Sequence, residues 1–376
     1  MKTPGSMDRA AAHLRREWSL LLSLATCALF AAGGTTVLNH LMGVRWLPLT
    51  SIWLFALLIT ASLSVVRHAD ALAHRLGEPL GTLVLTLSVI AIEVTSISAV
   101  MVHGQNNPTL VRDTLFAVIM IVLNGMVGLS LFFGGWVHRE QHYNLQGANA
   151  YLSVIVPLAV LSLILPDFTR TTPGPTLSVY QELFLAAVCV GLYAIFLAIQ
   201  TGRHRAYFDP ANGTVKGSGV APPAHRGSAW PSALFVIAYL VPVIYMAELL
   251  AHPIDYLIET LHAPVALGGV IIAVLVAAPE ALSAIKASLA NEMQRSVNIS
   301  LGSVLSTIGL TIPAMLLISQ FIGRPFVLGL EHTDIVLLLL TLFSSSVTFA
   351  SGRSTVLQGC VHLLLFLVYL LLIFQD

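Results

Sequence analysis

Charged residues are scarce in this sequence, and their scarcity excludes an ordinary soluble protein. Asp, Glu, Lys and Arg make up 10% of the 376 residues, whereas a soluble domain contains about 25%. Hydrophobic residues reach 56%, so most of the chain can lie in lipid. The 18 basic and 18 acidic residues balance, which provides no basic surface for nucleic acid. We therefore predict a polytopic membrane protein whose partner is the lipid bilayer, with no nucleic-acid partner.

Cysteines and nucleotide-binding loops are also scarce. The three cysteines, Cys27, Cys189 and Cys360, each lie in an apolar run, which favours packed small side chains over disulfide partners. The sequence contains no Gly-rich nucleotide-binding loop, so transport driven by ATP is not expected. No cofactor is expected, and any bound inorganic ion is treated as transported cargo.

Eleven apolar runs are long enough to cross a bilayer, because a membrane helix needs about 20 residues. The first run follows a basic, polar N-terminus and has no clear small-residue cleavage site, so we predict a retained helix and not a signal peptide. The eleven runs lie near 18–39, 48–66, 79–102, 111–134, 148–166, 178–200, 231–251, 264–290, 298–321, 331–349 and 356–374.

The distribution of Lys and Arg predicts the orientation of these helices. If the N-terminus is cytoplasmic, 14 of the 18 basic residues lie in cytoplasmic segments and 4 lie outside. Such a bias sets membrane topology through the positive-inside rule. We expect a multi-pass protein of the bacterial inner (plasma) membrane, with its N-terminus in the cytoplasm and its C-terminus outside.

A polar, Gly- and Pro-rich segment at 201–230 divides the chain, and its composition is typical of a flexible linker. The expected fold is an all-α polytopic membrane protein with about 11 transmembrane helices. Its predicted parts are an N-terminal tail with an extra helix (1–40), a first five-helix repeat (41–200), a cytoplasmic linker (201–230) and a second five-helix repeat (231–376).

Two glutamates lie inside apolar runs, where an unpaired charge costs several kcal/mol and usually marks a functional site. Glu93 is in the third run and Glu280 in the eighth, and a glycine, Gly81 or Gly268, precedes each of them by twelve residues. Because the eighth run comes five helices after the third, an odd number, the helices of the two motifs run in opposite directions. This predicts an inverted repeat with a transport site at its interface. The alternative is a structural pair of protonated carboxyls that bond across packed helices.

The helix after each glutamate supplies candidate neutral ligands. Aligning Arg112 with Arg295 places Asn124 opposite Thr307, and a one-residue shift replaces Thr307 by Ser306. A hydroxyl in a membrane helix often bonds its own backbone instead, so that alternative stays open for each of them. The predicted metal-binding residues are Glu93, Glu280, Asn124, Ser303, Thr307 and Ser306.

At these residues the chain resembles the cation/Ca2+ exchanger superfamily, and within it the ChaA-type calcium/proton (or sodium/proton) antiporters. The motifs that carry the resemblance include GEPLGTLVLTLSVIAIEV, APEALSAIKASL and QRSVNISLGSVLSTIGLTIP. Sodium/calcium exchangers have hydroxyl residues before the glutamate, whereas here Ile92 precedes Glu93 and Pro279 precedes Glu280. Fewer hydroxyls argue against a site for several sodium ions and suit coupling to protons.

Two glutamates also suit such an exchange chemically. Ca2+ binds about six to eight oxygens, carboxylates among them, and one Ca2+ or two protons neutralise the pair. When it is empty and ionised, the pair suffers desolvation and mutual repulsion, so the empty site favours protons. We predict a secondary active antiporter, not an enzyme, that exports Ca2+ in exchange for H+ by alternating access. Na+ or K+ are alternative cations. An intramembrane two-carboxylate enzyme and a cation channel are the alternative functions, and a homo-oligomer is left open.

Overall fold

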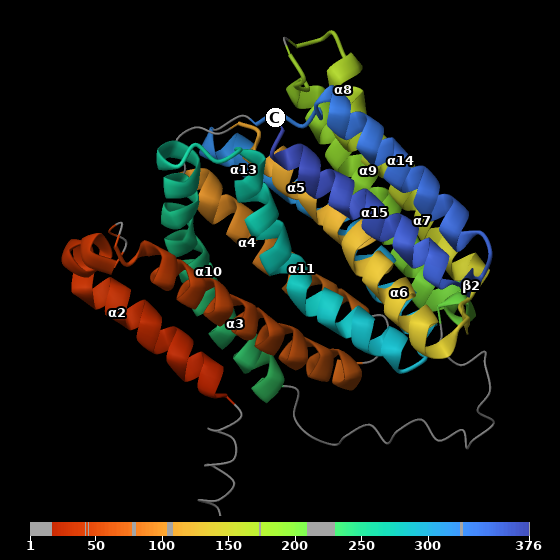
Figure 1. Cartoon of the computed structure of the whole chain (residues 1–376), viewed down its shortest axis with the longest axis horizontal. Helices are drawn as coiled ribbons and strands as arrows, with labels where there is room; N and C mark the ends of the chain where they lie inside the picture. Colours follow the sequence, from red (N-terminus) through yellow and green to blue (C-terminus); the bar gives the residue numbers. More distant parts are fainter. Residues whose placement is uncertain are drawn as a thin grey trace, which may run out of the picture.

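The computed structural model describes residues 17–41, 43, 45–76, 80–103, 108–172, 174–208, 230–323 and 326–375, and it is helical almost throughout (Figure 1). Within these ranges each of the eleven predicted helices is present. The unbroken ones are α2 (Trp18–Leu41), α3 (Leu47–Leu76), α4 (Leu80–His103), α11 (Ala266–Leu289), α14 (His332–Phe349) and α15 (Val356–Ile373).

Five helices contain or end in a π-helical segment. Three of them are interrupted: α5 (Leu110–Met120) continues through η1 (Ile121–Met126) into α6 (Val127–His138), α7 (Leu145–Ala159) through η2 (Val160–Ile164) into α8 (Leu165–Phe168), and α12 (Met293–Ser306) through η6 (Thr307–Thr311) into α13 (Ile312–Ile322). Two end in one: α9 (Val179–Ala198) in η3 (Ile199–Arg203), and α10 (Trp230–Asp255) in η5 (Tyr256–Thr260).

The chain is a multi-pass membrane protein. Among the described residues, ten helices are long and apolar enough to span a bilayer, and α2 has a shorter apolar stretch at Trp18–Gly33. Two helices extend furthest beyond the predicted apolar runs, because their ends are polar: α3 continues from 66 to Leu76, and α10 with η5 from 251 to Thr260. Of the predicted linker, a short 3-10 helix η4 (Arg205–Tyr207) is described, whereas 209–229 and the tail 1–16 lie outside the described residues.

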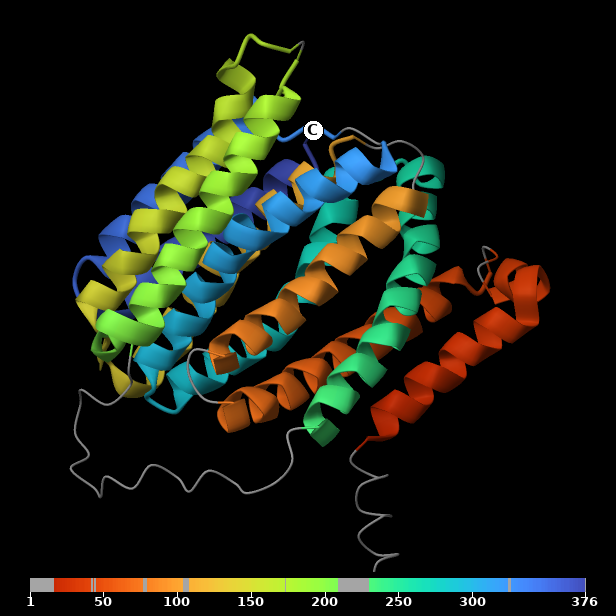
Figure 2. The same ribbon diagram turned by 180° about the vertical axis from the view of Figure 1, so that it is seen from behind.

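The helices form two groups with a third set between them. α2, α3 and α10 lie together on one side, and α6, α7, α9, α14 and α15 on the other, with α4 and α11 between (Figures 1 and 2). α10 packs on α3 and α4, α11 packs on α5, α6 and α12, and α15 packs on α6. Two short strands, β1 (Gln141–His142) and β2 (Arg353–Ser354), pair antiparallel at one end of the second group.

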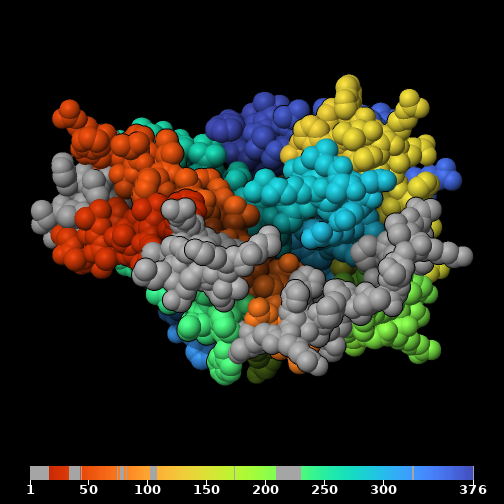
Figure 3. All heavy atoms as spheres, turned by 90° about the horizontal axis from the view of Figure 1, so that it is seen from below, coloured from red at the N-terminus to blue at the C-terminus, as the bar shows by residue number. Residues whose placement is uncertain are grey.

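The ends of these helices define two faces of the molecule. At one face, which we call the linker face, α3, α9 and α11 end and α4, α7, α10 and α12 begin. We call the opposite face the far face. Figure 3 shows the linker face, with α2 and α3 at one side, α6 at the other and the turn from α11 to α12 between them.

The two glycines that precede the membrane glutamates make corresponding close contacts. A Cβ on Gly81 would lie 2.5 Å from the carbonyl oxygen of Ala73 on α3, and a Cβ on Gly268 would lie 3.0 Å from Ile254 Cγ2 on α10. Each glycine therefore lets its helix approach the preceding helix closely, as small residues commonly do in membranes. Both glycines thus contact the preceding helix, but the packing around them differs, because α3 packs along α4 whereas α10 packs on α3 and α4.

Candidate cation-binding site

Glu280 lies in the second half of α11, where the side chains of α12 face it. The Ser303 hydroxyl donates a hydrogen bond to Glu280 Oε2, and the Ser306 hydroxyl donates to the backbone oxygen of Ser303 at 2.9 Å. All three residues line a cavity of about 420 Å³. Glu280 is therefore accessible from this cavity, and Ser303 orients its carboxyl group.

The same cavity extends to the linker face. Its wall includes residues from the end of α3, the start of α4, the start of α7, the last turns of α9 with η3, and the start of α12: Arg67, Asp70, Leu85, Tyr151, Gln200, Arg295 and Asn298. Because these helix ends all meet at the linker face, the cavity connects that face with Glu280.

Glu93 lies on α4 and is 1% exposed. Its Oε2 accepts hydrogen bonds from Thr311 at 2.8 Å and Thr307 at 3.1 Å. Its Oε1 is also buried, and among the described residues it has no hydrogen-bond partner. Glu93 and Glu280 are neighbours across the same helix, because Ser303, which bonds Glu280, lies one turn before Thr307, which bonds Glu93. A buried carboxylate oxygen without a donor is rare in folded proteins. This oxygen could carry a proton or bind a cation.

The two threonines that bond Glu93 lie at the ends of a π-helical segment. η6 begins at Thr307 and ends at Thr311, so the wider turn presents both hydroxyls to one carboxylate oxygen. Single π-helical turns are frequent at functional sites. Thr311 was not among the predicted ligands. Its spacing of four residues from Thr307 places both on one helix face, and this signal could have identified it.

Asn124 lies in the corresponding π-helical segment, η1, but its amide is engaged elsewhere. Its Nδ2 donates to the Thr341 hydroxyl at 2.8 Å, and its Oδ1 lies 3.2 Å from His362 Nδ1. His362 is wholly buried, and its Nε2 lies 3.0 Å from the Thr348 hydroxyl. Of the predicted neutral ligands, the structure brings Ser303 and Thr307 into contact with the glutamates and Ser306 to the cavity wall. It places Asn124 in a polar network with α14 and α15.

Comparison with known proteins gives consistent similarities. The family model described as "Sodium/calcium exchanger protein" matches residues 46–202 and 231–375. The sodium-potassium/proton antiporter ChaA of Escherichia coli is 39% identical over 371 residues, which cover 96% of each chain. The y4hA protein of Sinorhizobium fredii is 41% identical over 360 residues, covering 94% of this chain and 95% of that protein. Among solved structures, YfkE, a Ca2+/H+ antiporter, superposes with a TM-score of 0.71 at 18% identity, covering 95% of this chain and 100% of YfkE.

Proposed function

Because the chain belongs to the sodium/calcium exchanger family, we propose that this cation/proton antiporter binds Ca2+ and protons in turn at Glu93 and Glu280 and exports Ca2+. The observation that supports this most is the unpartnered Oε1 of Glu93, which is buried beside a second carboxyl group. Two carboxylates so placed would repel each other unless protons or a cation neutralise them.

Charge neutrality would couple the two fluxes. One Ca2+ or two protons bring the pair to zero charge, whereas the empty, ionised pair carries two negative charges in a membrane interior where an uncompensated charge is costly. The protein would then change its access readily only with Ca2+ or protons bound. Ser303, Thr307 and Thr311 would supply neutral oxygens, and Ser306 and Asn124 remain proposed ligands.

The cavity suggests which side is open. The excess of Lys and Arg at the linker face is that of a cytoplasmic face under the positive-inside rule. Ca2+ would then reach Glu280 from the cytoplasm through this cavity. On the far face, α11 lies against α5, since a Cβ on Gly269 would come within 2.8 Å of the Asp113 backbone carbon. This arrangement would be an inward-facing state of an inner-membrane transporter.

Na+ or K+ is a second candidate cargo. The similarity that favours it is the 39% identity to a protein named as a sodium-potassium/proton antiporter. Against it, two carboxylates match the charge of one divalent ion, and a monovalent ion would leave one carboxylate to be protonated.

Purified protein in liposomes with an imposed pH gradient tests the proposal. We expect saturable proton movement on adding Ca2+, and an apparent KM for Ca2+ that rises as the pH on the cation side falls, because protons compete for the same oxygens. Na+ and K+ in separate assays identify the preferred cargo. Cation flux that neither moves protons nor saturates would indicate a channel instead.

Replacing Thr311 by Val should weaken cation binding. The change keeps the side-chain shape but removes a hydroxyl that donates to Glu93 Oε2 at 2.8 Å, and a hydrogen bond to a charged group contributes about 1.5–3 kcal/mol. The ionised carboxylate loses this support, so the KM for the cation should rise roughly tenfold or more. A matched control is Thr60→Val, because within the described residues the Thr60 hydroxyl bonds only to the Leu57 carbonyl of its own helix, at 2.8 Å. Equal KM values for the two variants would contradict the role of Thr311.

A further inference from the structure

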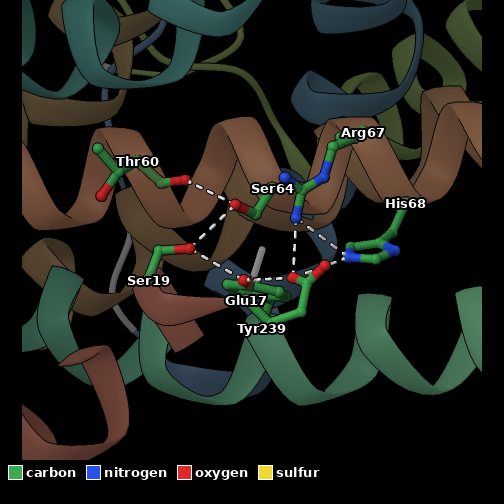
Figure 4. Close-up of polar contacts among 7 residues, drawn as sticks. All are labelled: Glu17, Ser19, Thr60, Ser64, Arg67, His68 and Tyr239. Carbon is green, nitrogen blue, oxygen red and sulfur yellow. Dashed lines mark hydrogen bonds and ion pairs between the residues drawn. The ribbon is translucent and has the colours of Figure 1, made fainter. Parts of the chain in front are cut away.

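Another buried carboxyl group, that of Glu17, lies apart from the glutamate pair, where α2 begins. Its Oε2 accepts hydrogen bonds from Arg67 Nη2 at 2.8 Å and from the Tyr239 hydroxyl at 2.8 Å (Figure 4). The same oxygen lies 3.2 Å from His68 Nε2. The Glu17 side chain is 10% exposed, so one carboxylate oxygen joins α2 to side chains of both α3 and α10.

Further contacts fix this cluster in place. The Ser19 hydroxyl lies 2.9 Å from the Tyr239 hydroxyl and 3.2 Å from that of Ser64, and Figure 4 shows these groups between the three helices. The His68 ring stacks on Phe235 of α10, with the ring centroids 4.7 Å apart. The position of Glu17 is therefore determined by α3 and α10, and not by α2 alone.

Arg67 connects this cluster with the cation site. It forms part of the wall of the cavity that leads to Glu280, while its Nη2 binds Glu17. Its Nε is buried and, in the part of the chain that the structure describes, has no hydrogen-bond partner. A free guanidinium in this wall would repel any cation that enters.

Among the residues that the structure describes, the other charged side chains of this wall are Asp70, Glu280 and Arg295. Arg295 also has a carboxylate partner, since its Nη1 lies 3.2 Å from Glu292 Oε2. That pair is exposed, at 58% and 49%, so water already screens it. Arg67 is the less exposed of the two arginines. The neutralisation of its positive charge therefore depends more on its partner, Glu17, than on water.

We propose that Glu17 is a positioning residue for cation entrance: its carboxylate neutralises Arg67 and holds the guanidinium so that it does not block or repel a cation moving from the linker face to Glu280. The inference rests on the proposed cation/proton exchange. It gives the additional N-terminal helix a part in transport, acting through Arg67 without touching the transported ion.

The protonation state of Glu17 supports this role. Burial raises the pKa of the Glu17 carboxyl, but hydrogen bonds from Tyr239 and His68, together with nearby positive charge, leave the pKa below its ordinary value. The group is therefore ionised at neutral pH and can cancel the charge of Arg67. Charges in a narrow cavity with low-dielectric walls change the local concentration of ions strongly.

The test uses the full-length chain in liposomes, with the KM and the maximal rate for Ca2+ measured from the linker face. Glu17→Gln should raise the KM roughly three- to tenfold with a near-normal maximal rate, and more at low salt than at high salt. Glu17→Asp, which keeps the carboxylate, should rescue most of the change. Glu140→Gln is the matched control, because Glu140 is 56% exposed and pairs at 3.8 Å with Arg353, which lies away from the cavity wall.

The double variant Glu17→Gln with Arg67→Gln separates positioning from packing. If Glu17 acts through the charge of Arg67, the double variant should return the KM to near the wild-type value. A KM that stays raised, or a Glu17→Gln variant that keeps the wild-type KM, would overturn the inference. If instead the wild-type chain moves no protons in response to any cation, the proposed function itself fails, and this outcome is distinct from the other two.

Discussion

Replacing Glu93 or Glu280 by Gln is expected to abolish coupled exchange. Glutamine has nearly the same shape, so Ser303, Thr307 and Thr311 keep a side-chain oxygen to bond. It carries no negative charge and takes up no proton at neutral pH, so each variant loses half of the charge that balances Ca2+. Removing one partner of a buried ion pair costs about 3–5 kcal/mol. If the carboxylate is that partner of the bound Ca2+, the cation affinity falls roughly 100-fold or more.

The measurement is cation-dependent proton movement in liposomes, with direct Ca2+ binding by calorimetry as a second readout. Glu182→Gln is the control, because Glu182 is also on a membrane helix, α9, where its Oε2 accepts a hydrogen bond from Gln320 at 2.6 Å, away from the cavity. A Glu93→Gln or Glu280→Gln protein that exchanges Ca2+ as the wild type does would refute the two-carboxylate mechanism and favour a purely structural pair.

The sequence predicted the helices well, because each apolar run was long and bounded by polar residues. The predicted helix ends are wrong where a helix continues into polar residues beyond its apolar run. α3 continues past the apolar run through Arg67 and His68, which a hydropathy count excludes from a membrane helix. These side chains are accommodated because Glu17, 50 residues earlier in the chain, binds both of them. A partner so distant in sequence leaves no local pattern.

The glutamates could be predicted from the sequence, but most of their neighbours could not. A carboxyl group in an apolar run is conspicuous by itself, whereas the neighbours of a carboxyl depend on how helices rotate against one another. Aligning the repeats placed Asn124 and Thr307 in equivalent positions. In the structure Glu93 is bonded by two threonines from the predicted second repeat. Asn124 has partners 217 and 238 residues away, on α14 and α15. Asn124 lies within η1 (Ile121–Met126), whereas Thr307 is the first residue of η6 (Thr307–Thr311). The alignment did not contain this difference in position.

Replacing Arg112 by Gln should destabilise the protein far more than the same change at Arg295, although the two arginines occupy equivalent positions in the aligned repeats. The Arg112 side chain is 7% exposed, and its Nε lies 2.8 Å from Asp113 Oδ1. Its other nitrogens bond the Gly329 carbonyl at 3.1 Å and Glu331 Oε1 at 3.3 Å. Loss of one partner of a buried ion pair costs about 3–5 kcal/mol.

Arg295, by contrast, is 58% exposed in its pair with Glu292, and an exposed pair contributes about 0–1 kcal/mol. Thermal unfolding in detergent should therefore show a large fall in Tm for Arg112→Gln and little change for Arg295→Gln. The difference follows from where the two arginines lie: Arg112 is buried and ties the start of α5 to the segment before α14, beside a second cavity of about 360 Å³ at the far face. Arg295 is exposed in the wall of the cavity that leads to Glu280. Equal Tm values for the two variants would mean that the buried Arg112 network stabilises the fold no more than the exposed Arg295 pair does.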